Sequence, residues 1–385
     1  MLKRTLYDEE HDIFRRTVRA WAEREVFPHS EAWREAGCVS RDLWKTAGAQ
    51  GFLCMYAAEA HGGMEVEDFR YDMVLCEELG PREPGFFIGL HNRIVGPYLQ
   101  NAASDAQRAR FMPGAVSGDR VMAIAMTEPG TGSDLAGIKT RAVEMDDHWI
   151  LNGSKTYISN GFLCDLVLVA ARTNPEARHE IGLFWVETDT PGFARGRNLK
   201  KVGLESQDTA ELFFDDVKVP KENVLGDPRG GFRTMMMNLA EERLIGAVGF
   251  AARAERAFDL TMDYIMERRA FGQPVGTFQN SRFKMASMRT ELDAAWALTD
   301  HCAREHMKGE LTAEMAAEAK LYTSEVEGRV VDECLQLHGG AGYMDEYEIS
   351  RLYRDARISR IYAGTSEIMR EIIGRGLGLD DRRRN

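Results

Sequence analysis

Residues 166–186 read LVLVAARTNPEARHEIGLFWV, and this stretch decides the fold class of the chain. Two apolar runs, 166–170 and 181–186, are rich in β-branched and aromatic residues and flank a polar segment that contains Asn174 and Pro175. Short runs of this composition, bounded by turn-forming residues, are typical of β-strands. No long helical period separates them, so a parallel β-α-β unit is disfavoured and an antiparallel sandwich or barrel is predicted.

The same pattern of short strands extends on both sides, from about residue 119 to residue 228. Further runs lie at 121–126, 149–151 and 211–214. Outside this region apolar residues recur at helical spacing, with Asp8 and Ser40 as predicted N-caps. Long helices are expected at 232–268, 277–307, 312–337 and 365–375. The prediction is an α+β multidomain chain: an N-terminal helical domain (1–118), a central antiparallel β-sandwich or barrel-like domain (119–228) and a C-terminal four-helix-bundle-like domain (229–385).

Composition excludes several classes of function. The 385 residues include 49 Lys and Arg against 61 Asp and Glu, a net charge of −12 that disfavours nucleic acid and anionic membrane surfaces as partners. The 6 cysteines form no CxxC pair and the 9 histidines show no ligand spacing, so neither a metal site nor a disulfide framework is expected. No secretory signal or membrane-spanning run is recognised. We therefore expect an intracellular protein, cytoplasmic in a bacterium or in the mitochondrial matrix of a eukaryote.

Several motifs contain more glycine and polar residues than local structure requires. MTEPGTGSDLAG (126–137) fits an irregular loop at the end of a hairpin, or a loop whose N–H groups and Thr127 and Ser133 hydroxyls approach a polar or phosphorylated ligand. KTYISNG (155–161) is expected to place Tyr157 and Ser159 on one face of a strand. In IYAGTSEI (361–368), Thr365 is a predicted helix cap. Glu241, Glu242 and Arg243, taken alone, fit a solvated charge cluster.

Taken together and in order, five motifs resemble the acyl-CoA dehydrogenase family: MTEPGTGSD, NGSKTYISNG, ERRAFGQPV, LQLHGGAGY and IYAGTSEIMR. The resemblance covers nearly the whole chain. It implies a flavoprotein of fatty acid β-oxidation that uses FAD to convert an acyl-CoA into its trans-2-enoyl-CoA and passes electrons to an electron-transfer flavoprotein. It also implies a homo-oligomer, usually a tetramer.

The resemblance further assigns cofactor and substrate contacts. Thr127 and Ser159 would hydrogen-bond the flavin ring, and Tyr157 would pack against it. Ser133 would lie where flavin and substrate meet, and Thr365 and Glu367 would hold the other end of the cofactor. Arg268, Phe271, Gln279, Gln336 and Gly340 would reach the FAD of a neighbouring subunit. The full set implied for FAD is Met126, Thr127, Gly132, Ser133, Tyr157, Ser159, Arg268, Phe271, Gln279, Gln336, Gly339, Gly340, Thr365 and Glu367.

One position departs from the common family pattern. Many members carry the catalytic glutamate directly after the tyrosine of the last motif, where this chain has Ala363. Long-chain and isovaleryl-type members instead take the glutamate from the helix after the β domain, directly before an arginine, and Glu242-Arg243 matches that pattern. Glu242 is thus predicted to be the base, with the Ala363 N–H helping to polarise the thioester carbonyl. The predicted substrate-binding set is Ser133, Ala240, Glu241, Arg243, Ala363 and Gly364.

Substrate length is predicted from subgroup likeness. The stretches TEPGTGSDLAGIKT, SQDTAELFFDD and EERL follow the long-chain type, and Pro84, Gly85 and Gly89 are expected to open the acyl cavity. A long straight or methyl-branched acyl chain is therefore preferred over a short branched, isovaleryl-type one. Arg233 stands where the long-chain subgroup has a substrate-contacting tyrosine. Rival interpretations are a flavin monooxygenase or nitroalkane-oxidase-like enzyme on the same fold, and a helical scaffold without FAD.

Overall fold

The computed structural model describes residues 2–379, and its elements follow the order helices, strands, helices. The N-terminal part is helical, as predicted, and Ser40 caps its helix by accepting a hydrogen bond from the Leu43 N–H at 3.3 Å. A π-helical turn, η3 (Leu90–Val95), precedes α5. The helices are α1 (Glu9–Glu25), α2 (Ser30–Ala36), α3 (Arg41–Ala49), α4 (Phe69–Leu79), α5 (Gly96–Asn101) and α6 (Asp105–Ser117).

The central part is a curled sheet in which β4 and β5 pair in antiparallel fashion, from Leu166 opposite Glu187 to Arg172 opposite Ile181. Both runs were predicted to be strands of an antiparallel domain, and both are strands that pair with each other in antiparallel fashion. The sheet also contains parallel pairings, because β1 and β2 both run parallel to β4. The strands are β1 (Met122–Ala125), β2 (Arg141–Glu144), β3 (His148–Ser159), β4 (Leu166–Arg172), β5 (Ile181–Glu187), β6 (Phe193–Asn198) and β7 (Thr209–Pro220).

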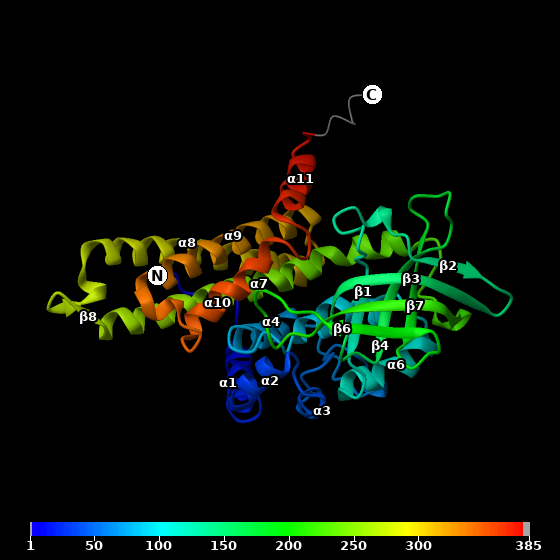
Figure 1. The fold of residues 1–385 in the computed structure, drawn as a ribbon, viewed down its shortest axis with the longest axis horizontal. Coiled ribbons are helices and arrows are strands. Elements are labelled where there is room, and N and C mark those ends of the chain that lie inside the picture. The colour runs from blue at the N-terminus through cyan, green and yellow to red at the C-terminus, as the bar shows by residue number, and fades with distance from the viewer. Residues whose placement is uncertain (1, 380–385) are drawn as a thin grey trace.

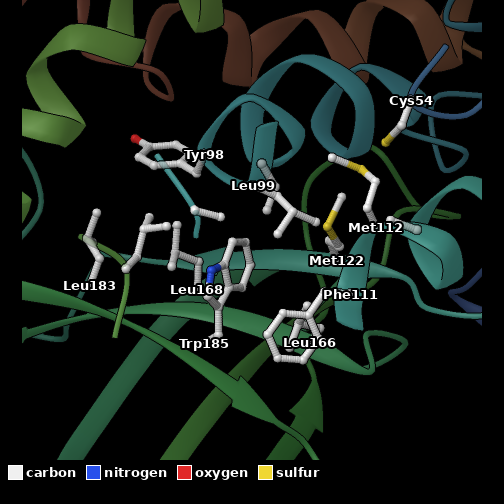
Figure 2. Packing of buried hydrophobic residues seen from close by; sticks show 14 of the residues in the cluster. Cys54, Tyr98, Leu99, Phe111, Met112, Met122, Leu166, Leu168, Leu183 and Trp185 are labelled. Atoms are coloured by element: carbon white, nitrogen blue, oxygen red, sulfur yellow. The ribbon is translucent and has the colours of Figure 1, made fainter. Parts of the chain in front are cut away.

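β4 and β5 lack the alternation of a half-exposed strand because both of their faces are buried. On one face, Leu166, Leu168 and Trp185 pack against Leu99 and Phe111 of the N-terminal helices (Figure 2). On the other face, Val167, Val169, Phe184 and Val186 pack inside the curled sheet. The uninterrupted apolar runs that identified the fold class therefore join two domains.

The C-terminal part is a bundle of long helices with one short hairpin. The long helices begin and end close to the predicted residues, whereas α10 was not predicted. Its elements are α7 (Gly231–Glu267), β8 (Arg269–Ala270), β9 (Gln273–Pro274), α8 (Gln279–Met307), α9 (Ala313–His338), α10 (Glu348–Ala356) and α11 (Ser366–Gly376). The predicted class, with helical outer domains around a β domain, is confirmed.

Helix α7 runs through the molecule and contacts both the N-terminal helices and the central sheet. Its 37 residues span about 55 Å at the usual rise per residue. The central sheet lies beside the end where α7 begins, the β8–β9 hairpin lies at the other end, and the N-terminal helices pack along its middle (Figure 1). Among the described residues, no helix is long and apolar enough to cross a membrane.

Candidate active site

The charged residues Glu242 and Arg243 lie inside the protein. Their exposed fractions are 7% and 6%. A solvated charge cluster is therefore excluded for this pair. Small residues on the same helix, among them Ala247 and Ala251, are also buried and allow neighbouring elements to approach α7 closely. Buried ionisable residues of this kind belong either to structural ion-pair networks or to functional sites.

Glu242 has one hydrogen-bond partner in the described part of the chain. The Tyr98 hydroxyl, on α5, donates to Glu242 Oε1 at 3.2 Å. No ion pair to the Glu242 carboxylate is found within residues 2–379. Burial raises the pKa of Glu242 to about 7, against the lowering effects of the Tyr98 hydrogen bond and the Arg243 charge. A carboxyl group with that pKa can accept and release a proton near neutral pH.

Glu241, one residue earlier, lies in a very different environment. Its carboxylate forms ion pairs with His306 Nε2 at 3.2 Å and Arg93 Nη1 at 3.4 Å. Burial alone would raise the pKa of Glu241, but the His306 hydrogen bond and the Arg93 charge outweigh it and lower the pKa below its usual value. Glu241 is therefore an anion held between the Arg93 guanidinium and the His306 ring, a poor arrangement for a proton acceptor.

Next to Glu242, the Arg243 Nε is enclosed and has no hydrogen-bond partner in the described part of the chain. A buried polar atom without a partner costs free energy, and such atoms are concentrated where a ligand completes the site. On α9, burial lowers the pKa of Lys320 to about 8, and the nearby Arg243 charge contributes to this lowering.

The turn that carries Ala363 is strained and is anchored by Lys320. Ala363 has φ +52° and Gly364 has φ +93°, and the first of these is unfavourable for a residue with a side chain. The fully buried Lys320 donates from Nζ to the Gly364 carbonyl at 2.6 Å. After the turn, Thr365 caps α11 by accepting from the Ile368 N–H at 3.3 Å, as predicted.

A buried ion pair holds the predicted glycine-rich loop (126–137) against β3. Lys155 Nζ donates to Glu128 Oε1 at 2.8 Å and to the Met126 carbonyl at 3.0 Å. Glu128 also accepts from the backbone N–H groups of Lys139 and Thr140. These bonds fix the loop around Met126 and leave its outer side free.

That outer side fits a ligand better than it fits protein packing. A Cβ placed on Gly130 or Gly132 would meet no atom within 4 Å. Ser133 is exposed, and Tyr157 is 70% exposed with φ +59°. The open glycines lie on the loop, and the exposed, strained Tyr157 lies on β3, which the Thr156 N–H joins to the loop at the Thr127 carbonyl. Together these features fit a cofactor cradle.

Strand β3 is irregular at the second predicted motif. Its register against β7 shifts between Lys155 and Ile158, where Tyr157 takes its left-handed conformation. The predicted regular strand face shared by Tyr157 and Ser159 is therefore distorted. Tyr157 projects into solvent, whereas Ser159 is half-buried.

The remaining predicted cofactor residues lie far from Glu242. Arg268 follows α7, about 26 residues or roughly 39 Å along the helix from Glu242. Gly339 and Gly340 follow α9 at the same end, where His338 stacks on Tyr264 with centroids 4.2 Å apart. This end is exposed: Phe271 is 96% exposed, and a Cβ on Gly339 or Gly340 would meet nothing within 4 Å. The exposed group comprises Arg268, Phe271, Gln279, Gln336, Gly339 and Gly340.

Two glycines expected to open an acyl cavity are needed for packing instead. A Cβ on Gly85 would lie 2.4 Å from Ser206 Oγ, and one on Gly89 would lie 3.2 Å from Cys76 Sγ. The expectation for these glycines is wrong, because neither faces open space. A hollow of about 760 Å³ lies elsewhere, between the N-terminal segment and helices α1, α4, α7 and α8. It is lined by residues such as Arg4, Glu77 and Asp300, which already form ion pairs with one another.

Four residues of the Glu242 region were not predicted from the sequence: Arg93, Tyr98, His306 and Lys320. One of them left a signal. Lys320 shares a helical face with Ala316, Thr323, Ser324 and Glu327, where small residues mark close packing and a lysine is out of place. The contacts of Arg93 and Tyr98 cross between domains, and that of His306 joins α8 to α7, so local spacing does not reveal them.

Comparison with known families matches three consecutive parts of the chain. The models for the acyl-CoA dehydrogenase N-terminal, middle and C-terminal domains match residues 8–119, 123–217 and 229–378.

Individual relatives cover almost the whole chain. A mitochondrial long-chain specific acyl-CoA dehydrogenase from Sus scrofa is 44% identical over 380 residues, which are 98% of this chain and 88% of the relative. A mitochondrial isovaleryl-CoA dehydrogenase from Oryza sativa is 34% identical and covers 97% of this chain and 92% of the relative. The crystal structure of an acyl-CoA dehydrogenase from Geobacillus kaustophilus superposes with a TM-score of 0.96 at 46% identity, covering 97% of this chain and 100% of the other.

Proposed function

Because the chain belongs to the acyl-CoA dehydrogenase family, we propose that it binds FAD and oxidises a long-chain acyl-CoA, with Glu242 as the base. The enzyme is an acyl-CoA dehydrogenase, an oxidoreductase. The choice of base depends on one observation above all. Residue 363 is alanine, while Glu242 is a buried carboxyl group with a pKa of about 7 and no ion-pair partner within residues 2–379.

The proposed chemistry removes two hydrogens from adjacent carbons. Glu242 takes the proton from Cα, FAD supplies the acceptor for the hydride from Cβ, and the electrons of the broken Cα–H bond form the Cα=Cβ double bond. A thioester α-proton is weakly acidic, so the base needs a raised pKa and the carbonyl needs polarisation. The left-handed turn at Ala363, anchored by Lys320, supports a role for the Ala363 N–H as that polarising donor.

The chain offers two separate groups of residues for FAD. Met126, Thr127, Gly132, Ser133, Tyr157 and Ser159 lie in the β domain, with Thr365 and Glu367 at the start of α11. The second group, around Arg268 and Phe271, lies at the other end of α7 and is exposed. Because one chain does not bring the two groups together, we propose a homo-oligomer in which each FAD contacts two subunits, with an electron-transfer flavoprotein as the electron acceptor.

The preference for a long acyl chain is supported by the relatives. Identity to the long-chain specific enzyme is 44%, against 34% for the isovaleryl enzyme over a similar share of the chain. The glycines at 85 and 89 lend no support, since both are packed. A short branched acyl-CoA remains the alternative substrate.

The function is tested by anaerobic titration of the purified FAD-loaded protein with straight acyl-CoAs of increasing length and with isovaleryl-CoA. We expect stoichiometric bleaching of the flavin absorbance, fastest with the long chains. Fastest bleaching by isovaleryl-CoA would overturn the chain-length assignment. Rapid reoxidation by O₂ with substrate bound would favour the monooxygenase-like interpretation, and a protein that takes up no FAD would contradict the proposal altogether.

A further inference from the structure

One short segment of the N-terminal domain reaches both neighbouring glutamates of α7. The π-helical turn η3 carries Arg93, whose guanidinium pairs with Glu241, and α5 begins directly afterwards and carries Tyr98, whose hydroxyl bonds Glu242. π-Helical turns are rare and occur frequently at functional sites.

We propose that Tyr98 is the positioning residue of the catalytic base: it holds one carboxylate oxygen of Glu242 and leaves the other free for the substrate. The inference rests on the proposed function, in which Glu242 is the base. It goes further by assigning a role to a residue of a different domain that no sequence motif identified.

The geometry of Tyr98 is fixed on all sides. The residue is fully buried, its ring belongs to the apolar cluster with Leu99 and Trp185, and its hydroxyl points away from those side chains (Figure 2). The backbone before it is equally constrained. Pro97 stands in the first turn of α5, and a Cβ on Gly96 would lie 1.8 Å from the Tyr56 hydroxyl. Packing on the ring and on the backbone therefore fixes the position of the Tyr98 hydroxyl.

The two carboxylate oxygens of Glu242 differ in their surroundings. Oε1 accepts from Tyr98 at 3.2 Å. Within residues 2–379 no hydrogen bond to Oε2 is found, and this oxygen is not one of the fully enclosed polar atoms without a partner. Oε2 is therefore the atom left to take the substrate proton.

The same hydrogen bond favours the charged form of the base. A donor to a carboxylate stabilises the anion and lowers its pKa, here opposing the effect of burial. Tyr98 stays a donor because burial and the Glu242 charge raise the pKa of its hydroxyl. Glu241 and Arg243 also face Glu242, with Arg93, His306 and Lys320 one contact further away. Removing the Tyr98 oxygen changes none of these five side chains.

The test is the pH dependence of kcat/KM for Tyr98→Phe, which removes only the hydroxyl. The pKa of Glu242 should rise, so the acidic limb of the profile should move to higher pH by about one unit. Activity should fall about tenfold below the limb and return toward wild type above it. The pH dependence of the unfolding midpoint should shift in the same direction, which gives a readout independent of turnover.

Tyr7→Phe is the matched control. The Tyr7 hydroxyl also donates to a carboxylate, Glu77 Oε1 at 2.5 Å, but it bonds neither Glu241 nor Glu242. Its profile should overlay that of the wild type. A uniform loss of activity in Tyr98→Phe with an unmoved limb would overturn the inference, because a merely structural role predicts that result.

Running Glu242→Gln in parallel separates the two proposals. If Glu242→Gln keeps fast flavin bleaching, the assignment of the base fails. If Glu242→Gln loses bleaching while the Tyr98→Phe limb stays in place, only the role of Tyr98 fails.

Discussion

Helix α7 carries two buried arginine–glutamate neighbourhoods that differ in how completely they are paired. Arg253 Nε contacts Glu327 Oε1 of α9 at 2.7 Å, and both side chains are almost fully buried. Three turns earlier, Glu242 and Arg243 are buried to a similar degree, yet Glu242 has only the Tyr98 hydroxyl and no ion pair in the described part of the chain. Enclosed atoms without a hydrogen-bond partner occur in both neighbourhoods: Arg243 Nε here, and Arg253 Nη2 and Glu327 Oε2 in the other. The Arg253–Glu327 pair joins α7 to α9. The Glu242 carboxylate has no ion-pair partner within residues 2–379 and can bind a proton or a ligand.

This difference teaches how a structural ion pair and a catalytic group are told apart at equal burial. A buried pair offsets part of its desolvation cost by mutual attraction. Burial raises the pKa of Glu327 as well as that of Glu242, so the two carboxyl groups are told apart by the ion pair that Glu327 has and Glu242 lacks within residues 2–379. A buried carboxyl group without such a partner lowers stability, a cost that persists at functional sites. The comparison predicts opposite effects of mutation at the two places.

The largest effect on stability is expected at the closed pair. Glu327→Ala leaves Arg253 charged and unpaired inside the bundle, which should reduce the free energy of unfolding by about 3–5 kcal/mol. Glu348→Ala is the control, since it breaks an Arg256–Glu348 pair of the same 2.7 Å length with side chains that are 34% and 24% exposed. That variant should lose about 0–1 kcal/mol. Equal shifts of the thermal midpoint in the two variants would contradict the distinction.

A smaller effect of opposite sign is expected at the open site. The pKa of Glu242 in the folded protein is about 7, above the ordinary 4.5, so ionising Glu242 lowers the free energy of unfolding. This penalty is absent below pH 4.5, grows as the pH rises, and is complete above pH 7. Replacement by glutamine removes that cost, which corresponds to about 3 kcal/mol. Glu242→Gln should therefore unfold at a higher temperature than the wild type at pH 8, with the difference shrinking toward pH 5. A variant less stable than the wild type at pH 8 would show that Glu242 is a structural group.

The smallest effect is expected at the anchor of the Ala363 turn. Lys320→Met removes the 2.6 Å bond to the Gly364 carbonyl and frees a backbone turn held at positive φ. Flavin bleaching by acyl-CoA should slow by roughly tenfold, about the worth of one lost hydrogen bond. Lys284→Met, which breaks only a peripheral contact with Glu333, is the control. An unchanged rate in a Lys320→Met protein with full FAD content would remove Lys320 from the site.

The sequence predicted the elements that depend on local pattern. Asp8, Ser40 and Thr365 were expected to begin helices, and α1, α3 and α11 begin directly after them. The long helices of the C-terminal part and the strand character of residues 166–170 and 181–186 were likewise predicted, because hydrophobic period and turn residues act over a few positions.

Contacts between distant segments could not be predicted in this way. Whether Glu242 or Glu241 is free depends on Arg93 and His306, which come from two other elements. The parallel pairing of β1 with β4 depends on the path of the chain between them, and the packing of Gly85 against Ser206 depends on a neighbour 121 positions away. Such features follow from tertiary packing, which no local period encodes.

The central claim is that Glu242, and not its neighbour, is the base. The most direct measurement is single-turnover flavin bleaching by a long-chain acyl-CoA under anaerobic conditions, with Glu242→Gln and Glu241→Gln compared at equal FAD content. We expect Glu242→Gln to be slower than wild type by about 10²–10⁴-fold, the usual contribution of a general base, and Glu241→Gln to stay within about tenfold. Fast bleaching in Glu242→Gln together with its loss in Glu241→Gln would contradict the assignment.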